Sequence, residues 1–267
     1  IALNHLRQTI EKVSPTNSRI LIVGPSGSGK ELAARTIHIL SQRSSGPFVV
    51  INAAAITPER MEIELFGIEQ ANGGQQSKIG ALEEAHTGTL FIDEIADMPR
   101  ETQSKILRVL VEQTFQRVNG NTKVAVDVRI ISSTARNLEE EIVAGKFRED
   151  LFHRLSVVPI RVPPLAERRE DIPELIEYFQ EQISQATGLP KRRIGDDALA
   201  VLQSHDWPGN VRQLRNNVER LMILAGGDPD AIITANMLPP DVGSMVPNMP
   251  RGNGGEPAPD VQPASRT

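Results

Sequence analysis

The sequence predicts an α/β fold in which a parallel sheet is flanked by helices and is followed by a small, all-helical domain. Between residues 19 and 134, short apolar runs rich in β-branched residues alternate with helical segments. This order is typical of a parallel sheet whose strands are joined by helical crossovers. After residue 162 the patterns become exclusively helical, which indicates a second, smaller domain.

The strand candidates are short and apolar, and polar or glycine-containing segments bound them. They are residues 19–24 (RILIVG), 48–54 (FVVINAA), 89–95 (TLFIDEI) and 126–134 (VDVRIISST). Parallel strands need right-handed crossovers, so we expect a helix between successive strands. The segment 115–126 (FQRVNGNTKVAV) contains Asn-Gly between two extended runs, which predicts a hairpin.

Three regions are expected along the chain. The α/β domain spans residues 1–162, the helical domain spans 163–238, and a disordered linker spans 239–267. Pro163 and Pro164 separate the first two regions, because proline restricts both its own backbone and that of the residue before it. The last region is rich in proline and poor in apolar residues, which is typical of a disordered segment.

Composition excludes several classes of function. The net charge of −5 argues against strong nucleic-acid binding by this chain alone. The absence of cysteine excludes disulfides, thiol catalysis and Cys-based metal sites. No apolar run is long enough to cross a bilayer, so we expect no membrane partner. The chain begins at Ile1 without a signal peptide, and we expect a fragment of a longer cytoplasmic protein.

Residues 24–31 (GPSGSGKE) fit the pattern G-x-x-x-x-G-K between a predicted strand and a predicted helix. Gly27 and Gly29 let the backbone fold tightly, so that N–H groups face phosphate oxygens. The lysine can reach the β- and γ-phosphates. This context disfavours the alternative, a Gly/Ser turn ahead of an ordinary helix. The candidate nucleotide-binding residues are Gly24, Pro25, Ser26, Gly27, Ser28, Gly29, Lys30 and Glu31.

Two acidic positions bear on the metal. Glu31 stands where the general motif has a Ser or Thr hydroxyl on Mg²⁺; it could meet the metal through water or simply favour the helix N-terminus. Asp93 and Glu94 end an apolar strand. Asp93 at this place suits Mg²⁺, and Glu94 can act as general base toward water. An acidic turn after a strand is the alternative, and the phosphate loop upstream disfavours it. ATP and Mg²⁺ are therefore the expected ligands.

Further motifs follow one another in a fixed order from about residue 3 to residue 238. They are ELFG (64–67), GTLFIDEI (88–95), ILRVL (106–110), FREDLFHRL (147–155), PPLAERREDI (163–172) and WPGNVRQLRN (207–216). Together with GPSGSGKE, they resemble the AAA+ ATPases of bacterial enhancer-binding proteins, the activators of sigma-54 RNA polymerase. The likeness is greatest to the NtrX-like branch of the NtrC family of response regulators. It implies the AAA+ P-loop NTPase fold with a helical lid.

The resemblance implies roles for residues outside the phosphate loop. Asn52 is similar to the amide that holds the catalytic glutamate in an inactive pose, although it could instead cap its strand end. Thr134 corresponds to the sensor of the γ-phosphate, followed here by Ala135 where the family often has Asn. Arg212 is similar to the second sensor, which links the lid to nucleotide. An exposed helix arginine is the alternative.

Arg148 and Arg154 resemble the arginine fingers that a neighbouring subunit inserts into the active site. On one continuous helix, positions six apart differ by about 120°, so the two are expected to make different contacts. An ion pair between Asp150 and Arg154 is the alternative. The resemblance thus implies active sites shared between subunits, and a homo-oligomeric ring.

The segment after ELFG departs from the family. In sigma-54 activators a GAFTGA loop follows, whereas here residues 68–80 read IEQANGGQQSKIG. This loop has no aromatic anchor to bury in a partner. The resemblance therefore supports an ATPase more strongly than it supports sigma-54 activation.

The expected protein is the ATP-binding and ATP-hydrolysing centre of a bacterial two-component transcription regulator. A sensor histidine kinase and promoter DNA are expected partners through receiver and helix-turn-helix domains outside this chain, and sigma-54 contact is the weakest expectation. The alternative is a nucleotide-dependent oligomerisation scaffold with little hydrolysis. An ordinary P-loop kinase is disfavoured by the helical lid and the paired arginines.

Overall fold

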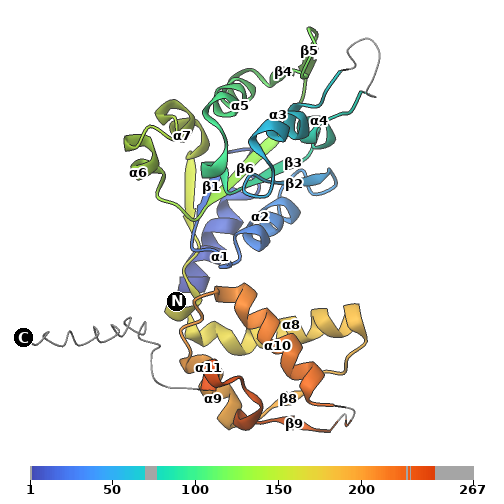
Figure 1. The fold of residues 1–267 in the computed structure, drawn as a ribbon, viewed down its shortest axis with the longest axis vertical. Coiled ribbons are helices and arrows are strands. Elements are labelled where there is room, and N and C mark those ends of the chain that lie inside the picture. Colours follow the sequence, from blue (N-terminus) through green and yellow to red (C-terminus); the bar gives the residue numbers. More distant parts are fainter. Residues whose placement is uncertain (1, 70–76, 227, 229, 244–267) are drawn as a thin grey trace, which may run out of the picture.

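The computed structural model describes residues 2–69, 77–226, 228 and 230–243 (Figure 1). The predicted parallel sheet is confirmed, with the strand order β2-β3-β6-β1-β7 and every pairing parallel. Its strands are β1 (Ile20–Val23), β2 (Phe48–Asn52), β3 (Thr89–Asp93), β6 (Arg129–Thr134) and β7 (Val158–Arg161). The helices of this α/β body are α1 (Ala2–Val13), α2 (Lys30–Ile39), α3 (Pro58–Phe66), α4 (Ala81–Glu84), α5 (Arg100–Glu112), α6 (Leu138–Val143) and α7 (Glu149–Leu155).

Helices cover both faces of the sheet, as the sequence predicted. Side chains alternate along each strand, so neighbouring residues enter different cores. In β1, Ile20 and Ile22 pack with α1 and α2, whereas Leu21 packs with α3, α5 and α7. In β3, Phe91 packs into the core formed with α1 and α2, and Leu90 packs into the core formed with α3, α5 and α7. The central strands are therefore buried on both sides.

The fifth strand, β7, was not among the predicted strands. It pairs with β1 through Ile20↔Val158 to Val23↔Arg161, and Pro159 lies inside it. Proline cannot donate a ladder hydrogen bond, so it weakens the strand signal in the sequence and is tolerated at the edge of a sheet. β7 is such an edge strand, and its end leads directly to Val162 and the helical lid.

The hairpin predicted around Asn-Gly is confirmed. β4 (Thr114–Gln116) and β5 (Lys123–Ala125) pair antiparallel, and Asn119 adopts a φ of 62° in the turn. The hairpin contacts the base of the preceding loop, because Ile68 bridges both Lys78 and Val118. Residues 70–76, the middle of the loop that stands in place of GAFTGA, lie outside the described residues.

A group of helices follows β7 and forms a hydrophobic core of its own, separate from the two cores of the body (Figure 1). Its elements are α8 (Ile172–Thr187), β8 (Arg193–Ile194), α9 (Asp196–Ser204), α10 (Asn210–Leu224), β9 (Ile232–Ile233) and α11 (Pro240–Gly243), with the short 3₁₀ turns η2 (Leu165–Glu167), η3 (Arg169–Asp171) and η4 (Ala235–Met237). Because β8 and β9 pair in parallel, this part is not all-helical as predicted but also contains a two-stranded sheet. A further 3₁₀ turn, η1 (Ile95–Asp97), follows β3 in the body. Trp207 is completely buried, and its Nε1 donates to the carbonyl of Leu202 at 2.7 Å. We call residues 163–243 the lid.

The lid extends into the region predicted as a linker from residue 239. α11 is helical, and Val242 is only 2% exposed in the lid core. Val242 follows Pro239 and Pro240 closely and packs into the lid core, so this segment is ordered. The proline-rich composition of the region did not indicate this. Residues 244–267, the rest of the predicted linker, lie outside the described residues. No helix in the described ranges is long and apolar enough to cross a membrane.

Arg129, at the start of β6, holds the end of α1 against the sheet. Its side chain is 2% exposed and donates to the carbonyls of Val13 (2.9 Å), Ser14 (2.9 Å) and Ser18 (3.1 Å). Burial lowers the pKa of this guanidinium to about 10, and Arg43 adds to the effect. The partial negative charge at the C-terminal end of α1 takes the place of a carboxylate partner.

Replacing Arg129 by methionine should destabilise the body. Arg129→Met keeps the length of the side chain but removes the Arg129 donors from the carbonyls of Val13, Ser14 and Ser18, at a cost of about 3 kcal/mol. Urea unfolding measures this free energy. Arg60→Met is the matched control, because Arg60 is 70% exposed and, among the described residues, pairs with Glu64 alone at 3.7 Å, so a change within about 0.5 kcal/mol is expected there. Equal losses in both variants would contradict the assigned role.

Candidate nucleotide-binding site

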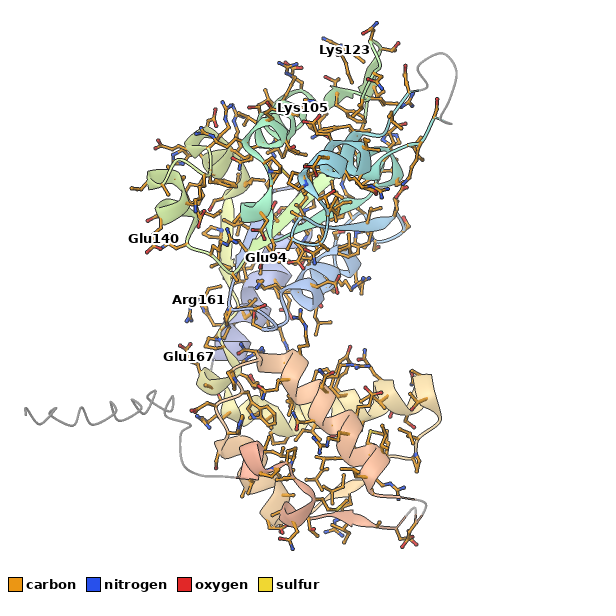
Figure 2. All side chains as sticks on the ribbon, viewed as in Figure 1. Glu94, Lys105, Lys123, Glu140, Arg161 and Glu167 are labelled. Carbon is orange, nitrogen blue, oxygen red and sulfur yellow. The ribbon has the colours of Figure 1, made fainter. Side chains whose placement is uncertain are left out.

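The candidate residues gather at one edge of the sheet, where the parallel strands end. The phosphate loop follows β1, Asp93 ends β3, and Thr134 ends β6. The pairing register places Val23 beside Thr134, and Asn52 beside Asp93. Ligands of open α/β sheets bind at this carboxyl edge. Figure 2 labels Glu94 on the body, with Arg161 and Glu167 where the chain passes from β7 to the lid.

The phosphate loop has the backbone that its glycines allow. Gly27 and Gly29 have φ values of 75° and 102°, which side chains with a Cβ adopt rarely. A Cβ on Gly27 would lie 2.5 Å from the carbonyl oxygen of Gly209 in the lid. The hydroxyl of Ser28 is buried and has no hydrogen-bond partner among the described residues. The loop is thus closely packed, with one polar atom left unpaired.

Lys30, the first residue of α2, points back over the loop that precedes it. Its side chain is 6% exposed, and its Nζ donates to the carbonyls of Gly24 (2.7 Å) and Pro25 (3.0 Å). Nζ also lies 3.8 Å from Oε1 of Glu94. Burial lowers the pKa of Lys30, while Glu94 and Asp93 oppose this effect. The ammonium is therefore held where an anion with several oxygens could replace neutral carbonyls.

Glu94 has a strained backbone, and its carboxylate accepts a hydrogen bond from the main chain. Its φ and ψ of 54° and 56° are left-handed, which is uncommon for a residue with a side chain. The backbone N–H of Ala135 donates to its two carboxylate oxygens at 3.1 and 3.4 Å. Burial raises the pKa of Glu94, and Lys30 opposes the rise. A raised pKa brings a carboxylate closer to the range suited to a general base.

Asp93 is held by a residue that the sequence analysis missed. The hydroxyl of Ser133 donates to Oδ1 of Asp93 at 2.7 Å. No cluster of three or more potential ligands among His, Cys, Asp and Glu is present in the described residues. Mg²⁺ does not need one, because it typically uses one or two carboxylates, substrate phosphates and water. Asp93 fits such a site. The signal for Ser133 was its place one residue before the end of the neighbouring strand.

Asn52 follows the alternative given above rather than the role implied by the resemblance. Its Oδ1 accepts a hydrogen bond from the backbone N–H of Ala54 at 3.0 Å, which caps the end of β2. Among the hydrogen bonds of the described residues, none joins Asn52 to Glu94. The amide that holds Glu94 in this structure is the main-chain N–H of Ala135.

Thr134 and Glu31 occupy different surroundings. Thr134 is completely buried; its hydroxyl accepts from the N–H of Arg136 at 3.0 Å, and its carbonyl accepts from Gly24 at 3.3 Å. Thr134 therefore ties the sheet to the phosphate loop. Glu31 lies on the exposed side of α2 and pairs with Arg35 at 3.8 Å. This placement favours the helix-terminus interpretation of Glu31.

The two candidate finger arginines are not on one helix. Arg148 has extended backbone and precedes α7, whereas Arg154 lies in its last turn. Arg148 is engaged within its own chain by Asp150 (2.8 and 3.0 Å) and by the hydroxyl of Ser104 (2.5 Å). The predicted alternative pair of Asp150 with Arg154 is not formed, since Asp150 pairs with Arg148. The angular argument between the two arginines therefore does not apply.

Arg154 is exposed, and its side chain makes no hydrogen bond or ion pair within the described part of the chain. It is close enough to Arg19 to lower the pKa of that guanidinium, after the larger effect of burial. Two neighbouring cations without a carboxylate between them form a positive surface that is suited to an anionic group from outside the subunit.

The lid touches the phosphate loop directly. The N–H of Arg212 donates to the carbonyl of Gly27 at 3.2 Å, while the Arg212 side chain is exposed. Arg212 is also close enough to Lys30 to help lower the pKa of Lys30. The sequence analysis missed two further lid residues: Asn210 donates to the carbonyl of Ser26 at 3.2 Å, and Arg168 to that of Ser28 at 2.7 Å.

Comparison with known families agrees with this geometry. The family described as "Sigma-54 interaction domain" matches residues 1–161, and the family described as "AAA+ ATPase lid domain" matches residues 166–253. The "Nitrogen assimilation regulatory protein NtrX" of Azorhizobium caulinodans is 74% identical over 254 residues, which are 95% of this chain and 56% of that protein. The "DNA-binding transcriptional regulator NtrC" of Rhizobium meliloti is 42% identical over 251 residues, covering 93% of this chain and 51% of that protein.

Solved structures match along most of the chain. A crystal structure of NtrX from Brucella abortus in complex with ADP has a TM-score of 0.85 and 65% identity, covering 95% of this chain and 56% of that one. The crystal structure of the same protein in complex with ATP has a TM-score of 0.82 and 67% identity, covering 91% and 56%. The chain spans about half the length of the curated relatives it matches. With a glycine loop, an acidic strand end and a lid in one fold, this chain belongs to the AAA+ sigma-54 interaction domain family of NtrC-type regulators.

Proposed function

We propose that this chain is the ATP-binding and ATP-hydrolysing centre of an oligomeric transcription regulator of the NtrX type. One observation carries the proposal: Lys30 after β1 and Glu94 after β3 meet at 3.8 Å beside a glycine loop whose carbonyls already hold the lysine. This arrangement provides a cation for phosphates and a carboxylate for water at one place. The solved structures of Brucella NtrX with ATP and with ADP support it.

Each residue of the site has a chemical role in this proposal. The N–H groups of the loop and Lys30 bind the phosphates, and Asp93 would hold the magnesium that accompanies ATP. Bound Mg²⁺ would neutralise charge on the phosphate oxygens. Glu94 orients and deprotonates the attacking water once it leaves the N–H of Ala135. Thr134 and Arg212 report the state of the nucleotide to the sheet and to the lid.

The site is completed by a second subunit in this proposal. Arg154 is the better candidate for the finger, because it is exposed and carries no acid partner in the described residues, whereas Arg148 is occupied by Asp150 and Ser104. A cation delivered by a neighbour stabilises charge on the transferring phosphoryl group. The active oligomer is then a homo-oligomeric ring.

The wider setting is that of a two-component system in the cytoplasm. A sensor histidine kinase and promoter DNA are proposed as partners of a longer protein that contains this chain. Sigma-54 contact is left open by the loop at residues 68–80, which carries no aromatic residue. A nucleotide-dependent scaffold with little hydrolysis is the second candidate. Ala135 favours it, because a methyl group replaces the polar side chain that the family often has beside the γ-phosphate sensor.

Removing the ammonium of Lys30 should weaken ATP binding. The Lys30→Ala variant loses a buried cation at the phosphate position, so we expect an affinity about 10- to 100-fold lower. Isothermal titration measures the affinity. Lys105→Ala is the control, because Lys105 is 53% exposed, pairs with Glu62, and lies far from Glu94 (Figure 2). Normal ATP binding by Lys30→Ala would count against the site.

ATP turnover per subunit should be low in dilute protein and should rise steeply with concentration, because one subunit does not supply its own finger. A phosphate-release assay over a wide range of protein concentration tests this, with Glu94→Gln as the blank. Glu94→Gln keeps the shape of the side chain but removes the base. Turnover at the level of the blank at every concentration, together with intact ATP binding, would favour the scaffold instead.

Mixing two inactive variants should restore hydrolysis. Arg154→Ala lacks the finger, and Glu94→Gln lacks the base, so each alone should lose about 10³-fold or more in turnover. In an equal mixture, about a quarter of the sites combine an intact Glu94 with an intact neighbouring Arg154 if the finger acts between subunits. Turnover of the mixture at the level of the separate variants would place Arg154 outside the neighbour's site.

A further inference from the structure

Three consecutive carbonyls of the phosphate loop are held by the lid. The carbonyls of residues 26, 27 and 28 each accept a hydrogen bond from a different residue of the lid. The bonds are Asn210 Nδ2 to Ser26 O (3.2 Å), Arg212 N to Gly27 O (3.2 Å), and Arg168 Nη2 to Ser28 O (2.7 Å). These contacts join segments that are far apart in the sequence.

Holding a carbonyl also fixes the N–H group of the next residue. In a planar trans peptide unit, the C=O and the following N–H point in opposite directions. The bond to Ser28 O therefore directs the N–H of Gly29, and the bond to Ser26 O directs the N–H of Gly27. The N–H of Ser28 is used inside the loop, where it donates to Pro25 O at 3.1 Å. The N–H groups of Gly27 and Gly29 have no protein acceptor in the described residues, and they remain for phosphate.

Arg168 makes the shortest of the three bonds and has little else to bind. Its side chain is 5% exposed, and the bond to Ser28 O is the only hydrogen bond of that side chain within the described residues. Its Nε is buried without a partner. Burial lowers the pKa of Arg168, and Asp171 opposes this effect. A buried guanidinium is costly to desolvate, so its place under the loop calls for a functional reason.

We propose that Arg168 is a positioning residue for nucleotide phosphates: it turns the Gly29 N–H into the site through Ser28 O, and thereby makes phosphate affinity depend on the docked lid. The inference rests on the proposed nucleotide site and deepens it. Because Arg168 precedes η3 and the first long lid helix, α8, a displaced lid would withdraw the donor from the loop. Release of phosphate and opening of the lid are then coupled.

The test compares two neighbouring arginines in the whole chain. Arg168→Met should bind ADP about 10-fold more weakly or worse, the size expected for losing a hydrogen bond from a charged group, while binding of adenosine, which has no phosphate, stays unchanged. Arg169→Met is the matched control. Arg169 donates to the carbonyls of Gln203 and His205 and pairs with Asp206, all within the lid.

The variants also separate positioning from stability. Arg168→Lys retains the charge and a single donor, so it should recover part of the ADP affinity. Thermal unfolding checks that each variant is folded at the temperature of titration. The inference is overturned if Arg168→Met loses no more ADP affinity than Arg169→Met does. It is also overturned if Arg168→Met loses as much affinity for adenosine as for ADP.

A measurement without nucleotide distinguishes this inference from the proposed function. The amide resonances of Gly27 and Gly29 in the ligand-free chain should shift in Arg168→Met and stay in place in Arg169→Met. If the wild-type chain fails to bind ADP while these resonances shift, the proposed function is wrong and Arg168 still positions the loop. Unchanged resonances in Arg168→Met overturn the inference in either case.

Discussion

The parallel pairing of β1 with β6 and β7 is the constraint on which the rest of the structure depends. β1 is short, and its side chains are divided between two cores. Its end must therefore lie beside Thr134 on one side and Arg161 on the other. The phosphate loop begins at this point, so the pairing brings a glycine loop, an acidic strand end and the entrance to the lid to one edge. Each of these groups is held by backbone geometry before any ligand is considered.

Charge is arranged at this edge so that buried cations rest on neutral carbonyls. Lys30 is held by the carbonyls of Gly24 and Pro25, Arg168 by that of Ser28, and Arg129 by the end of α1. Carbonyl dipoles compensate a buried cation less completely than a carboxylate does. For Arg129 the arrangement is structural, because three of its nitrogens each donate to a main-chain carbonyl at or just beyond the end of α1. For Lys30 and Arg168 the same arrangement leaves a positive potential that attracts a phosphate. Glu94 is the carboxylate that lies beside Lys30, at 3.8 Å.

Sequence patterns predicted the groups whose position follows from local chemistry. β1 and β3 were predictable because apolar runs end in a glycine loop and in an acidic pair, and parallel pairing of both strands with β6 brings their ends to the same edge. β7 was not, because Pro159 disguises an edge strand. Ser133 and Arg168 were missed for another reason: each acts through one contact made across the fold, which the surrounding sequence does not reveal even where, as for Arg168, it belongs to a recognised motif. The resemblance placed Asn52 beside Glu94, yet the local bond to Ala54 satisfies Asn52 at the strand end.

The unusual loop after ELFG is physically separable from the nucleotide site. Its base is fixed by main-chain bonds, since Glu69 N donates to Val118 O and Val118 N to Gly67 O, each at 2.9 Å. Arg117 adds a paired contact to Glu83 at 2.7 and 2.8 Å and a further one to Glu69 at 3.2 Å. The loop base and the hairpin therefore form one unit that is held by contacts among the described residues. Replacement of GAFTGA by a polar tip can remove a partner contact without disturbing Lys30, Asp93 or Glu94. A nucleotide site of this kind is consequently no evidence for sigma-54 contact, and the two properties must be judged on different residues.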